Sequence, residues 1–321
     1  MRFDRFIPGL LVLLAMVLPQ TVESKRITAN GRVYWSLNEV GLRYGMRDLG
    51  NDIADRKRRL SFQKDKRQFT INGVKYVLNF TPLAGSGTMF LSSADVYKQL
   101  DPILRPWTVP GHPGRHIVID PGHGGKDAGA LRGALREKDL TLNIARRVRD
   151  RLIRLGYRVT LTRNSDIALT LPQRAALAKA LKADLFLSIH INAAASGTAV
   201  AGIETYAMTP AGAPSSSNSK ADTRVYPGNR CDVNNLALAS MIHRYMLSRT
   251  GGTDRGVKRA RFQVLREITM PGVLIECGFI SNAAERKRLA TPAYQEKLAK
   301  GIADGVHAYR FSIMRNKTRL K

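Results

Sequence analysis

Four widely separated residues of this 321-residue sequence have side chains suited to metal-assisted hydrolysis. His123 lies in "IVIDPGHGGKDAGA" just after an apolar run, His190 follows in "LFLSIHI", and Glu276 lies near the end of "GVLIECG". Glu137 directly precedes a stretch with helical spacing. The carboxyl ends of strands in an open α/β sheet lie at one edge, so these residues can meet there. Two histidines and a glutamate form a ligand set of catalytic zinc that leaves the fourth position open to water.

The glycines around His123 fit this chemistry better than nucleotide binding. The loop has neither the G-x-x-x-x-G-K-[ST] spacing nor the G-x-G-x-x-G spacing of phosphate-binding loops. Gly122, Gly124 and Gly125 instead allow the chain to turn sharply after the strand, so that His123 can face a metal ion.

Each of these residues also has a purely structural interpretation. Histidines such as His123 and His190 are often hydrogen-bonded residues of cores or turns. Glu137 in "REKDL" could be an acidic residue favoured at a helix start by the helix dipole. Glu276 is harder to explain in this way, because a carboxylate at the end of an apolar strand needs a partner or a function. The spacing alone does not decide between the interpretations.

The elements that must position these residues alternate between strands and helices. Strands are expected at the apolar runs "HIVID", "RVTLTR", "LFLSIHI", "GIETYAM", "FQVLR" and "GVLIECG". Helices are expected around residues 140–152, where apolar residues recur at every fourth position, and at "LPQRAALAKAL", "NNLALASMIHRYML" and "AYQEKLAKGIADGVHAYRF". This order predicts an α/β three-layer sandwich with a mixed, mostly parallel central sheet over residues 115–311.

A small α+β domain is predicted to precede the sandwich, over residues 25–105. Asn72-Gly73 between two alternating stretches indicates a β-hairpin. One helix is expected between Ser36 and Gly45, and another at "SSADVYKQL", where serines can cap the helix start.

Three segments lack the periodicity of a helix or strand. Residues 106–114 are rich in proline and glycine and are predicted to form a linker, with His112 as a solvated linker residue. Residues 209–233 are rich in Pro, Ser, Gly and Asn and are predicted to form a mobile loop beside the substrate edge. Residues 312–321 are predicted to be a basic tail.

The N-terminus indicates export. Residues 1–24 combine two arginines with an apolar run, residues 7–18, that is too short to span a bilayer comfortably. Val22-x-Ser24 fits a signal peptidase site, so the mature protein is expected to begin near Lys25 without a membrane anchor. The expected location is the cell envelope, either the periplasm or the extracellular cell wall.

The charge balance is strongly basic. Lys and Arg number 52 against 25 Asp and Glu, which gives a formal net charge of +27. An exported protein with this charge meets anionic envelope polymers, and the sequence contains no nucleic-acid-binding motif. Cys231 and Cys277 form no C-x-x-C motif, and the sequence does not decide whether they pair.

Several of these motifs, in this order, resemble one enzyme family. "IVIDPGHGGKDAGA", "EKDLTLNIA", "ADLFLSIHINA", "GIETY", "RGVKRARFQVLRE" and "PGVLIECGFISN" are similar to the zinc-dependent N-acetylmuramoyl-L-alanine amidases of the amidase type 3 family, over residues 115–311. The resemblance implies a zinc-carboxypeptidase-like fold and cleavage of the amide between N-acetylmuramic acid and the L-alanine of the peptidoglycan stem peptide. Residues 25–105 resemble, more weakly, the N-terminal stalk domain of copper amine oxidases, which implies a role in spacing or wall contact. No copper ligands are evident in them.

The resemblance assigns roles to the candidate residues. It makes His123, Glu137 and His190 the zinc ligands, with Zn²⁺ as the cofactor. It makes Glu276 the catalytic carboxylate that takes a proton from water and passes it to the leaving amine.

Neighbouring polar residues could support the histidines. Asp120, Asp127 and Asn192 could orient them, or could simply cap turns. Family members that are controlled by cell-division activators carry a long inhibitory helix, and residues 209–233 are too rich in Pro, Gly and Ser to form one.

Three other functions are compatible with the sequence. A nucleic-acid-binding module is favoured only by the charge and is disfavoured by the export signal. A catalytically silent cell-wall-binding protein could keep the fold, although the presence of all four residues argues against it. A zinc peptidase that cleaves another bond of the stem peptide differs from the amidase only through the family resemblance.

Overall fold

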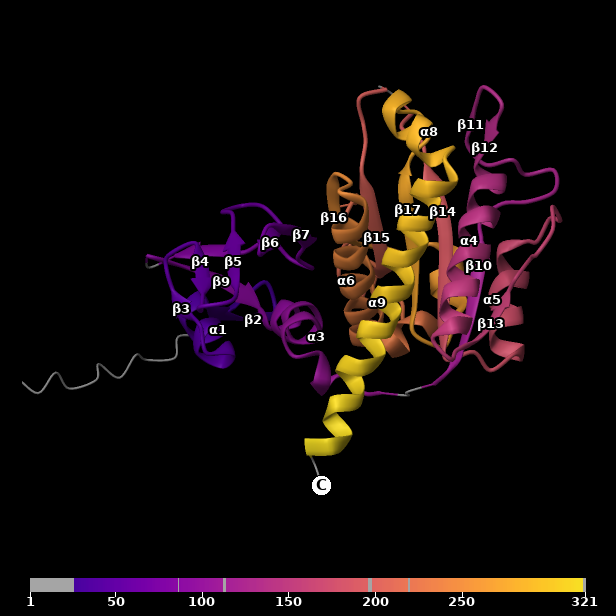
Figure 1. Ribbon diagram of the computed structural model, residues 1–321. Helices are drawn as coiled ribbons and strands as arrows, with labels where there is room; N and C mark the ends of the chain where they lie inside the picture. Colours follow the sequence, from indigo (N-terminus) through magenta and orange to yellow (C-terminus); the bar gives the residue numbers. More distant parts are fainter. Residues whose placement is uncertain (1–25, 86, 112–113, 196–197, 219, 320–321) are drawn as a thin grey trace, which may run out of the picture.

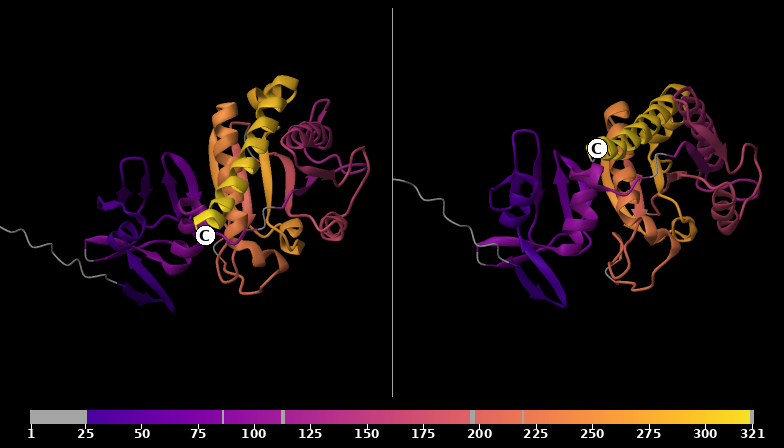
Figure 2. Two further views of the ribbon diagram at one scale, coloured as in Figure 1. Left: turned by 60° about the horizontal axis from the view of Figure 1, so that its bottom comes forward. Right: turned by 90° about the horizontal axis from the view of Figure 1, so that it is seen from below.

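The computed structural model describes residues 26–85, 87–111, 114–195, 198–218 and 220–319. Residues 1–24, predicted as a signal peptide, and His112 lie outside the described residues. The chain forms a larger unit with a central sheet and a smaller N-terminal unit beside it (Figures 1 and 2).

A mixed sheet lies at the centre of the larger unit. Its strands run in the order β13-β10-β14-β17-β15-β16. The first four are parallel to one another, β15 is antiparallel to β17, and β16 is parallel to β15. Their bounds are β10 (His116–Pro121), β13 (Arg158–Leu161), β14 (Leu185–Asn192), β15 (Ile203–Met208), β16 (Asp254–Ala260) and β17 (Gly272–Phe279). The central strands read as nearly continuous apolar runs because helices cover both faces of the sheet.

Helices pack on both faces of this sheet. On one face lie α4 (Glu137–Arg154), α6 (Asp232–Thr250) and α9 (Pro292–Arg319), which Figure 1 shows in front of the strands. On the other face lie α5 (Leu171–Ala180) and α7 (Gln263–Glu267), which share a separate apolar cluster with the sheet. A short helix, α8 (Ala283–Leu289), follows β17. The predicted three-layer α/β sandwich is therefore confirmed.

One predicted strand is wrong. The run "FQVLR" forms helix α7, and the strand in this part of the chain is β16, "DRGVKRA". A run of five residues is too short for the spacing of its apolar residues to distinguish a strand from a helix. Val264 and Leu265 are both buried in the apolar cluster that α5 and α7 share with the sheet. The strand was missed because it carries basic side chains, including Arg259, which is 2% exposed and donates to backbone carbonyls.

The smaller unit is rich in strands and contains the predicted hairpin. Asn72 (φ 49°) and Gly73 (φ 81°) form the two-residue turn between β6 and β7. Ser36 caps the start of α1 and Gly45, with φ 67°, ends it, both as predicted. The elements are β1 (Arg26–Ala29), β2 (Arg32–Ser36), α1 (Leu37–Tyr44), β3 (Arg47–Asp48), β4 (Asp52–Ala54), β5 (Arg59–Phe62), β6 (Gln68–Ile71), β7 (Val74–Val77), β8 (Leu83–Gly85), β9 (Thr88–Ser92), α2 (Ser93–Asp95), η1 (Val96–Leu100) and α3 (Asp101–Leu104).

The two units share one sheet. Tyr76 on β7 pairs in parallel with Val257 on β16, which joins the hairpin to the edge of the central sheet. The Lys75 backbone N–H donates to Asp254 Oδ2 over 2.7 Å, and Lys98 forms an ion pair with Asp232 at 3.0 Å. These contacts hold the smaller unit directly against the larger one.

The segment 209–233 docks through hydrogen bonds. Arg261 Nη2 donates to the carbonyls of Pro210 (3.0 Å) and Ala213 (2.7 Å), and Arg67 of the smaller unit donates to Ser215 O (2.6 Å). The segment ends in a short 3₁₀ helix, η3 (Pro227–Cys231), which leads into α6. Arginine side chains that bind its backbone carbonyls therefore position this segment, in place of the burial of periodically spaced apolar residues.

Residues 312–319, expected to be a tail, continue helix α9, and the predicted linker contains the 3₁₀ helix η2 (Pro106–Thr108), which packs against α9. Cys231 and Cys277 are free thiols. Among the described residues, no helix combines the length and the apolar character needed to cross a bilayer.

Candidate active site

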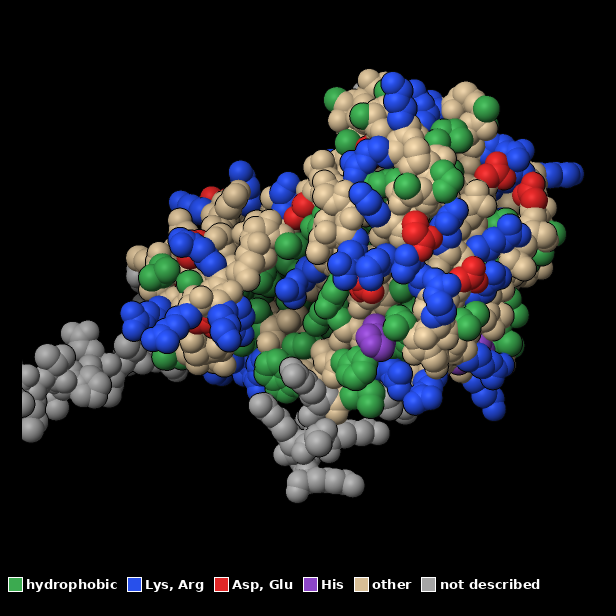
Figure 3. All heavy atoms as spheres, viewed as in Figure 1, with side chains coloured by type: hydrophobic (Ala, Val, Ile, Leu, Met, Phe, Trp, Pro, Cys, Tyr) green, Lys and Arg blue, Asp and Glu red, His purple; other side chains and the backbone are tan. Residues whose placement is uncertain are grey.

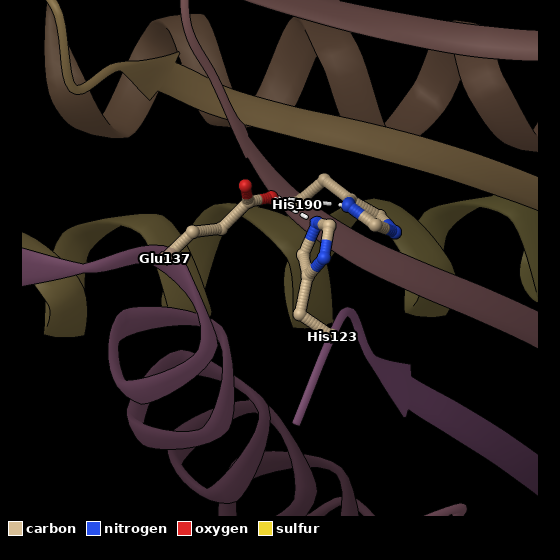
Figure 4. A group of neighbouring side chains, drawn as sticks. All are labelled: His123, Glu137 and His190. Carbon is tan, nitrogen blue, oxygen red and sulfur yellow. Dashed lines mark hydrogen bonds and ion pairs between the residues drawn. The ribbon is translucent and has the colours of Figure 1, made fainter. Parts of the chain in front are cut away.

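Three of the four predicted residues converge at one point (Figure 4). Glu137 Oε1 lies 3.1 Å from His123 Nε2 and 3.1 Å from His190 Nδ1. The candidate ligand atoms of the three residues all lie within 4.8 Å of one another. They come from the loop after β10, the first residue of α4 and the carboxyl-terminal part of β14. The sheet edge predicted from the sequence is thus where these side chains meet.

Glu137 is held in place by backbone donors. Its Oε2 accepts from the Ala130 N–H and its Oε1 from the Ile191 N–H, both at 2.9 Å. Burial raises the pKa of Glu137, but hydrogen bonds with His123 and His190 outweigh it and hold the pKa well below its usual range. Glu137 is therefore a carboxylate, which is the form that binds a metal ion.

His123 is oriented by Asp127. His123 has φ +62°, in the left-handed region, and its Nδ1 lies 2.8 Å from Asp127 Oδ2. Burial lowers the pKa of His123, but Glu137 and Asp127 more than offset it and raise the pKa above its usual value. The contact with Asp127 leaves Nε2 free to face Glu137 and a metal ion. Asp127 thus has the orienting role that the sequence analysis considered for it.

The glycines provide space as well as a turn. Gly124 and Gly125 have φ of +129° and +60°, which agrees with the expected sharp turn. A Cβ atom at Gly122 would lie 2.3 Å from His190 Cε1, and one at Gly129 would lie 2.6 Å from Glu137 Oε2. These two positions must lack a side chain for the histidine and glutamate to occupy their places.

Two buried arginines support the loop that carries His123. Arg163, 2% exposed, donates from Nη2 to Gly122 O over 2.8 Å, and Arg174 donates to His123 O over 2.8 Å. Asp120 pairs with Arg174 at 2.7 Å and does not contact either histidine. Asp120 therefore stabilises the loop backbone, not an imidazole. Neither arginine was predicted from the sequence, where the one signal was an arginine at the end of the apolar run "RVTLTR".

Glu276 lies one strand away from His190. The two residues are opposite each other on β14 and β17, and Glu204 on β15 is opposite Glu276 on its other side. Glu276 is partly buried, and its buried Oε2 has no hydrogen-bond partner among the residues that the structure describes. Burial, followed by the nearby Glu137 and Glu204 carboxylates, raises the pKa of Glu276 well above its usual value. Such an unpaired carboxyl group fits a role in proton transfer.

A polar network around Glu204, which is 2% exposed, was missed from the sequence. Glu204 Oε1 accepts from Lys258 Nζ (2.6 Å) and Arg255 Nε (2.8 Å). Its Oε2 accepts from the Tyr206 hydroxyl (2.7 Å) and from Asn192 Nδ2 (3.2 Å). Asn192 therefore contacts Glu204, not the histidines as considered above. The sequence shows an acidic residue in "GIETY" and basic residues in "DRGVKRA" of β16, but it does not show that these residues contact each other.

The donor set at the convergence point suits zinc. Two imidazole nitrogens and one ionised carboxylate are the protein ligands of open, catalytic zinc sites, whereas magnesium and calcium prefer sites made of oxygen atoms. Asp127 supplies the outer contact that fixes a ligating histidine in such sites. The residues present therefore fit a zinc ion.

Comparisons with known proteins agree with this site. A model of the N-acetylmuramoyl-L-alanine amidase family matches residues 117–308. The uncharacterised protein YqiI of Bacillus subtilis (strain 168) is 39% identical over 197 residues, which cover 61% of this chain and 85% of YqiI. The N-acetylmuramoyl-L-alanine amidase LytC of the same strain is 39% identical over 61% of this chain but only 36% of LytC. The catalytic domain of the amidase CwlV from Bacillus (Paenibacillus) polymyxa var. colistinus is 38% identical, with a TM-score of 0.51, over 61% of this chain and 97% of that structure.

The family match includes every element that carries a candidate residue. Strands β10, β14 and β17 and helix α4 all lie within it, apart from the first residue of β10, whereas the smaller unit lies outside. This chain therefore belongs to the N-acetylmuramoyl-L-alanine amidase family and is a hydrolase of peptidoglycan.

Proposed function

We propose that this chain binds one zinc ion through His123, Glu137 and His190 and uses Glu276 for proton transfer. The reaction is hydrolysis of the amide between N-acetylmuramic acid and the L-alanine of the stem peptide. The observation that carries the proposal is the position of Glu137 Oε1, 3.1 Å from a nitrogen of each histidine, with Glu276 on the strand next to His190.

Each residue has a defined task in this reaction. Zinc bound at this site would polarise the scissile carbonyl and activate a water molecule near neutral pH. Glu276 accepts a proton from the attacking water and delivers it to the amine of L-alanine as the C–N bond breaks. Asp127 keeps His123 in the orientation that points Nε2 into the site. Arg163 and Arg174 keep the loop backbone in place around them.

The alternative of a silent wall-binding protein is less well supported. A carboxyl group that serves only structure would be paired, because buried polar atoms nearly always have hydrogen-bond partners. Glu276 Oε2 has none among the described residues, which favours a reactive role. A zinc peptidase that cleaves another bond of the stem peptide remains an outcome of the experiment below.

The surroundings of the protein follow from its N-terminus and charge. We propose secretion to the cell envelope after signal cleavage, with a formal net charge of +27 favouring contact with anionic wall polymers. Figure 3 shows Lys and Arg side chains spread over both units on the face in view, with few acidic side chains among them. The smaller unit, with its resemblance to a stalk domain, would add contact with the wall.

The experiment that tests this function is mass spectrometry of digested peptidoglycan. Purified, zinc-loaded protein is expected to release free stem peptides that begin at L-alanine while the glycan chains stay intact. Release of shorter peptides would indicate a peptidase that acts on another bond. Binding to the wall without any released product would support the silent wall-binding protein.

A further inference from the structure

A groove of about 570 Å³ lies between the two units. One wall comes from the β5–β6 turn and the hairpin of the smaller unit, and the other comes from β15, β16 and the 209–233 segment. Arg67 fixes the walls relative to each other, because it lines the groove and donates to the carbonyls of residues 214–216. Its lining includes Asp65, Lys66, Arg67, Tyr206, Ser217 and Lys258.

The groove carries an excess of positive charge. Its charged lining residues are three cations, Lys66, Arg67 and Lys258, and one carboxylate, Asp65. The hydrogen-bond acceptors of Arg67 are neutral carbonyl oxygens. Lys258 and Arg255 both form ion pairs with Glu204, so one negative charge faces two positive charges. A ligand that bears carboxylates would complement this lining.

The groove and the candidate active site lie on the same face of the sheet. His190, Glu276 and Glu204 are successive cross-strand neighbours on β14, β17 and β15, and Lys258 on β16 pairs with Tyr206. Residues opposite each other share a face of the sheet, and so do residues two apart on one strand. Tyr206 is two residues beyond Glu204 on β15, so Lys258 lies on the same face as the histidine but two residues out of its row. Three strand spacings of about 4.8 Å, combined with the two-residue offset along the strand, place the Lys258 backbone about 16 Å from that of His190. An extended peptide of four residues reaches about 14 Å, and the Lys258 side chain extends back toward the row, since its Nζ contacts Glu204.

We propose that this groove binds the distal, carboxylate-bearing part of the stem peptide while its N-terminal amide lies at the zinc site. Lys66 and Lys258 provide the cationic contacts, and Tyr206 provides an apolar surface between them. The smaller unit thereby forms one wall of the substrate site in addition to any contact with the wall polymer. This inference rests on the amidase function proposed above.

The test compares two soluble substrates with the full-length, zinc-loaded protein. One is an N-acetylmuramoyl tetrapeptide with free carboxylates, and the other is the same compound with its peptide carboxylates converted to amides. Lys66→Glu is the main variant. Lys64→Glu is its matched control, because Lys64 is also exposed and lies two residues away but does not line the groove.

The expected result is a change in KM that depends on substrate charge. Lys66→Glu should raise KM for the free acid about three- to tenfold, since it replaces an exposed attraction with a repulsion, and should leave kcat unchanged. It should not raise KM for the amidated substrate, and Lys64→Glu should change neither value. Equal effects on both substrates, or equal effects of the two variants, would overturn the proposal.

A variant of the opposite wall tests the same peptide from the other side. Ser217 is exposed and lines the groove, so Ser217→Glu should also raise KM for the free acid alone. No change in this variant would overturn the claim that both walls bind one peptide. Cleavage of the amidated substrate by the wild type reports on the amidase function separately. If the wild type cleaves neither substrate, the proposed function itself fails.

Discussion

His190 and Glu276 lie directly opposite each other on the adjacent parallel strands β14 and β17. The candidate zinc ligand and the candidate proton-transfer group are therefore positioned by the register of a buried sheet, not by mobile loops. A slip of one residue would turn either side chain to the opposite face, where α4, α6 and α9 pack. This rigid arrangement allows the roles of individual residues to be tested by small substitutions.

Glu276→Gln is expected to lower turnover strongly without loss of zinc. The substitution is nearly isosteric and leaves His123, Glu137 and His190 unchanged, but it removes the group that accepts the proton. The fall in kcat should be about 10² to 10⁴-fold, the usual range for general acid–base catalysis. Zinc content, melting temperature and hydrolysis are measured on the same preparation. Wild-type turnover in a zinc-loaded Glu276→Gln protein would show that another group transfers the proton.

His190→Ala is expected to lower zinc content and activity together, because it removes one of three protein ligands. Chelation of the wild type should likewise abolish activity, and added zinc should restore it. The control is His307→Ala, since His307 contacts Tyr157 and Phe311 far from the ligand set. Atomic absorption of both variants checks the result. A His190→Ala protein with a full complement of zinc would contradict the assigned ligand set.

Gly122→Ala is expected to disturb the site without unfolding the protein. The added Cβ would lie 2.3 Å from the His190 ring, so the ring must move and zinc affinity should fall about 10- to 100-fold. Gly85→Ala is the matched control, because the Cβ there meets only Phe90 at 3.8 Å. Competition with a fluorescent zinc chelator measures the affinity. Equal zinc affinity in the two variants would mean that the loop adapts to the extra atom.

Asp254 is expected to link stability to pH at the junction of the two units. Burial raises the pKa of Asp254, but hydrogen bonds from His243 and from the N–H groups of Lys75 and Gly256 outweigh it and lower the pKa. A lowered pKa means that the carboxylate stabilises the folded state above about pH 3.9, the unfolded value. That contribution is lost as the pH falls through the lower folded value.

Asp254→Asn should therefore cost about 1–3 kcal/mol of unfolding free energy at pH 7 and less near pH 3. Urea unfolding at both pH values measures the difference. Asp65→Asn serves as the control, because Asp65 is exposed and should change stability little at either pH. A loss that is equal at both pH values would show that the charge of Asp254 does not matter.

Arg261→Ala is expected to loosen the 209–233 segment. Arg261 Nη2 donates to three carbonyls of that segment, of Pro210, Ala213 and Asp222. Limited digestion with a non-specific protease should cut the segment before the core, and several-fold faster in the variant. Arg224→Ala is the control, since the exposed Arg224 forms its ion pair with Asp222, which lies inside the same segment. Equal cleavage rates in all three proteins would mean that Arg261 does not hold the segment.

The sequence by itself determined the layers of the fold and the four candidate residues. Apolar runs and helical spacing are local properties, so five of the six strands predicted for the larger unit, and its long helices, were found. His123, Glu137, His190 and Glu276 could be grouped because each lies in the carboxyl-terminal half of a strand, just after a strand, or at the first residue of a helix. The topology brings these positions to one edge of the sheet. The predictions failed for short stretches of mixed polarity, namely α7 and β16, because burial against the rest of the fold decides the conformation of such stretches.

The tertiary structure alone decided how side chains from distant segments pair. Asp120 could have oriented a histidine, but the position of α5 places Arg174 against it. Glu204 finds its two cations only because β16 lies beside β15, and the groove exists only because the hairpin joins that strand. Such contacts depend on the distance and direction of side chains in space, and neither is encoded in the local spacing of residue types.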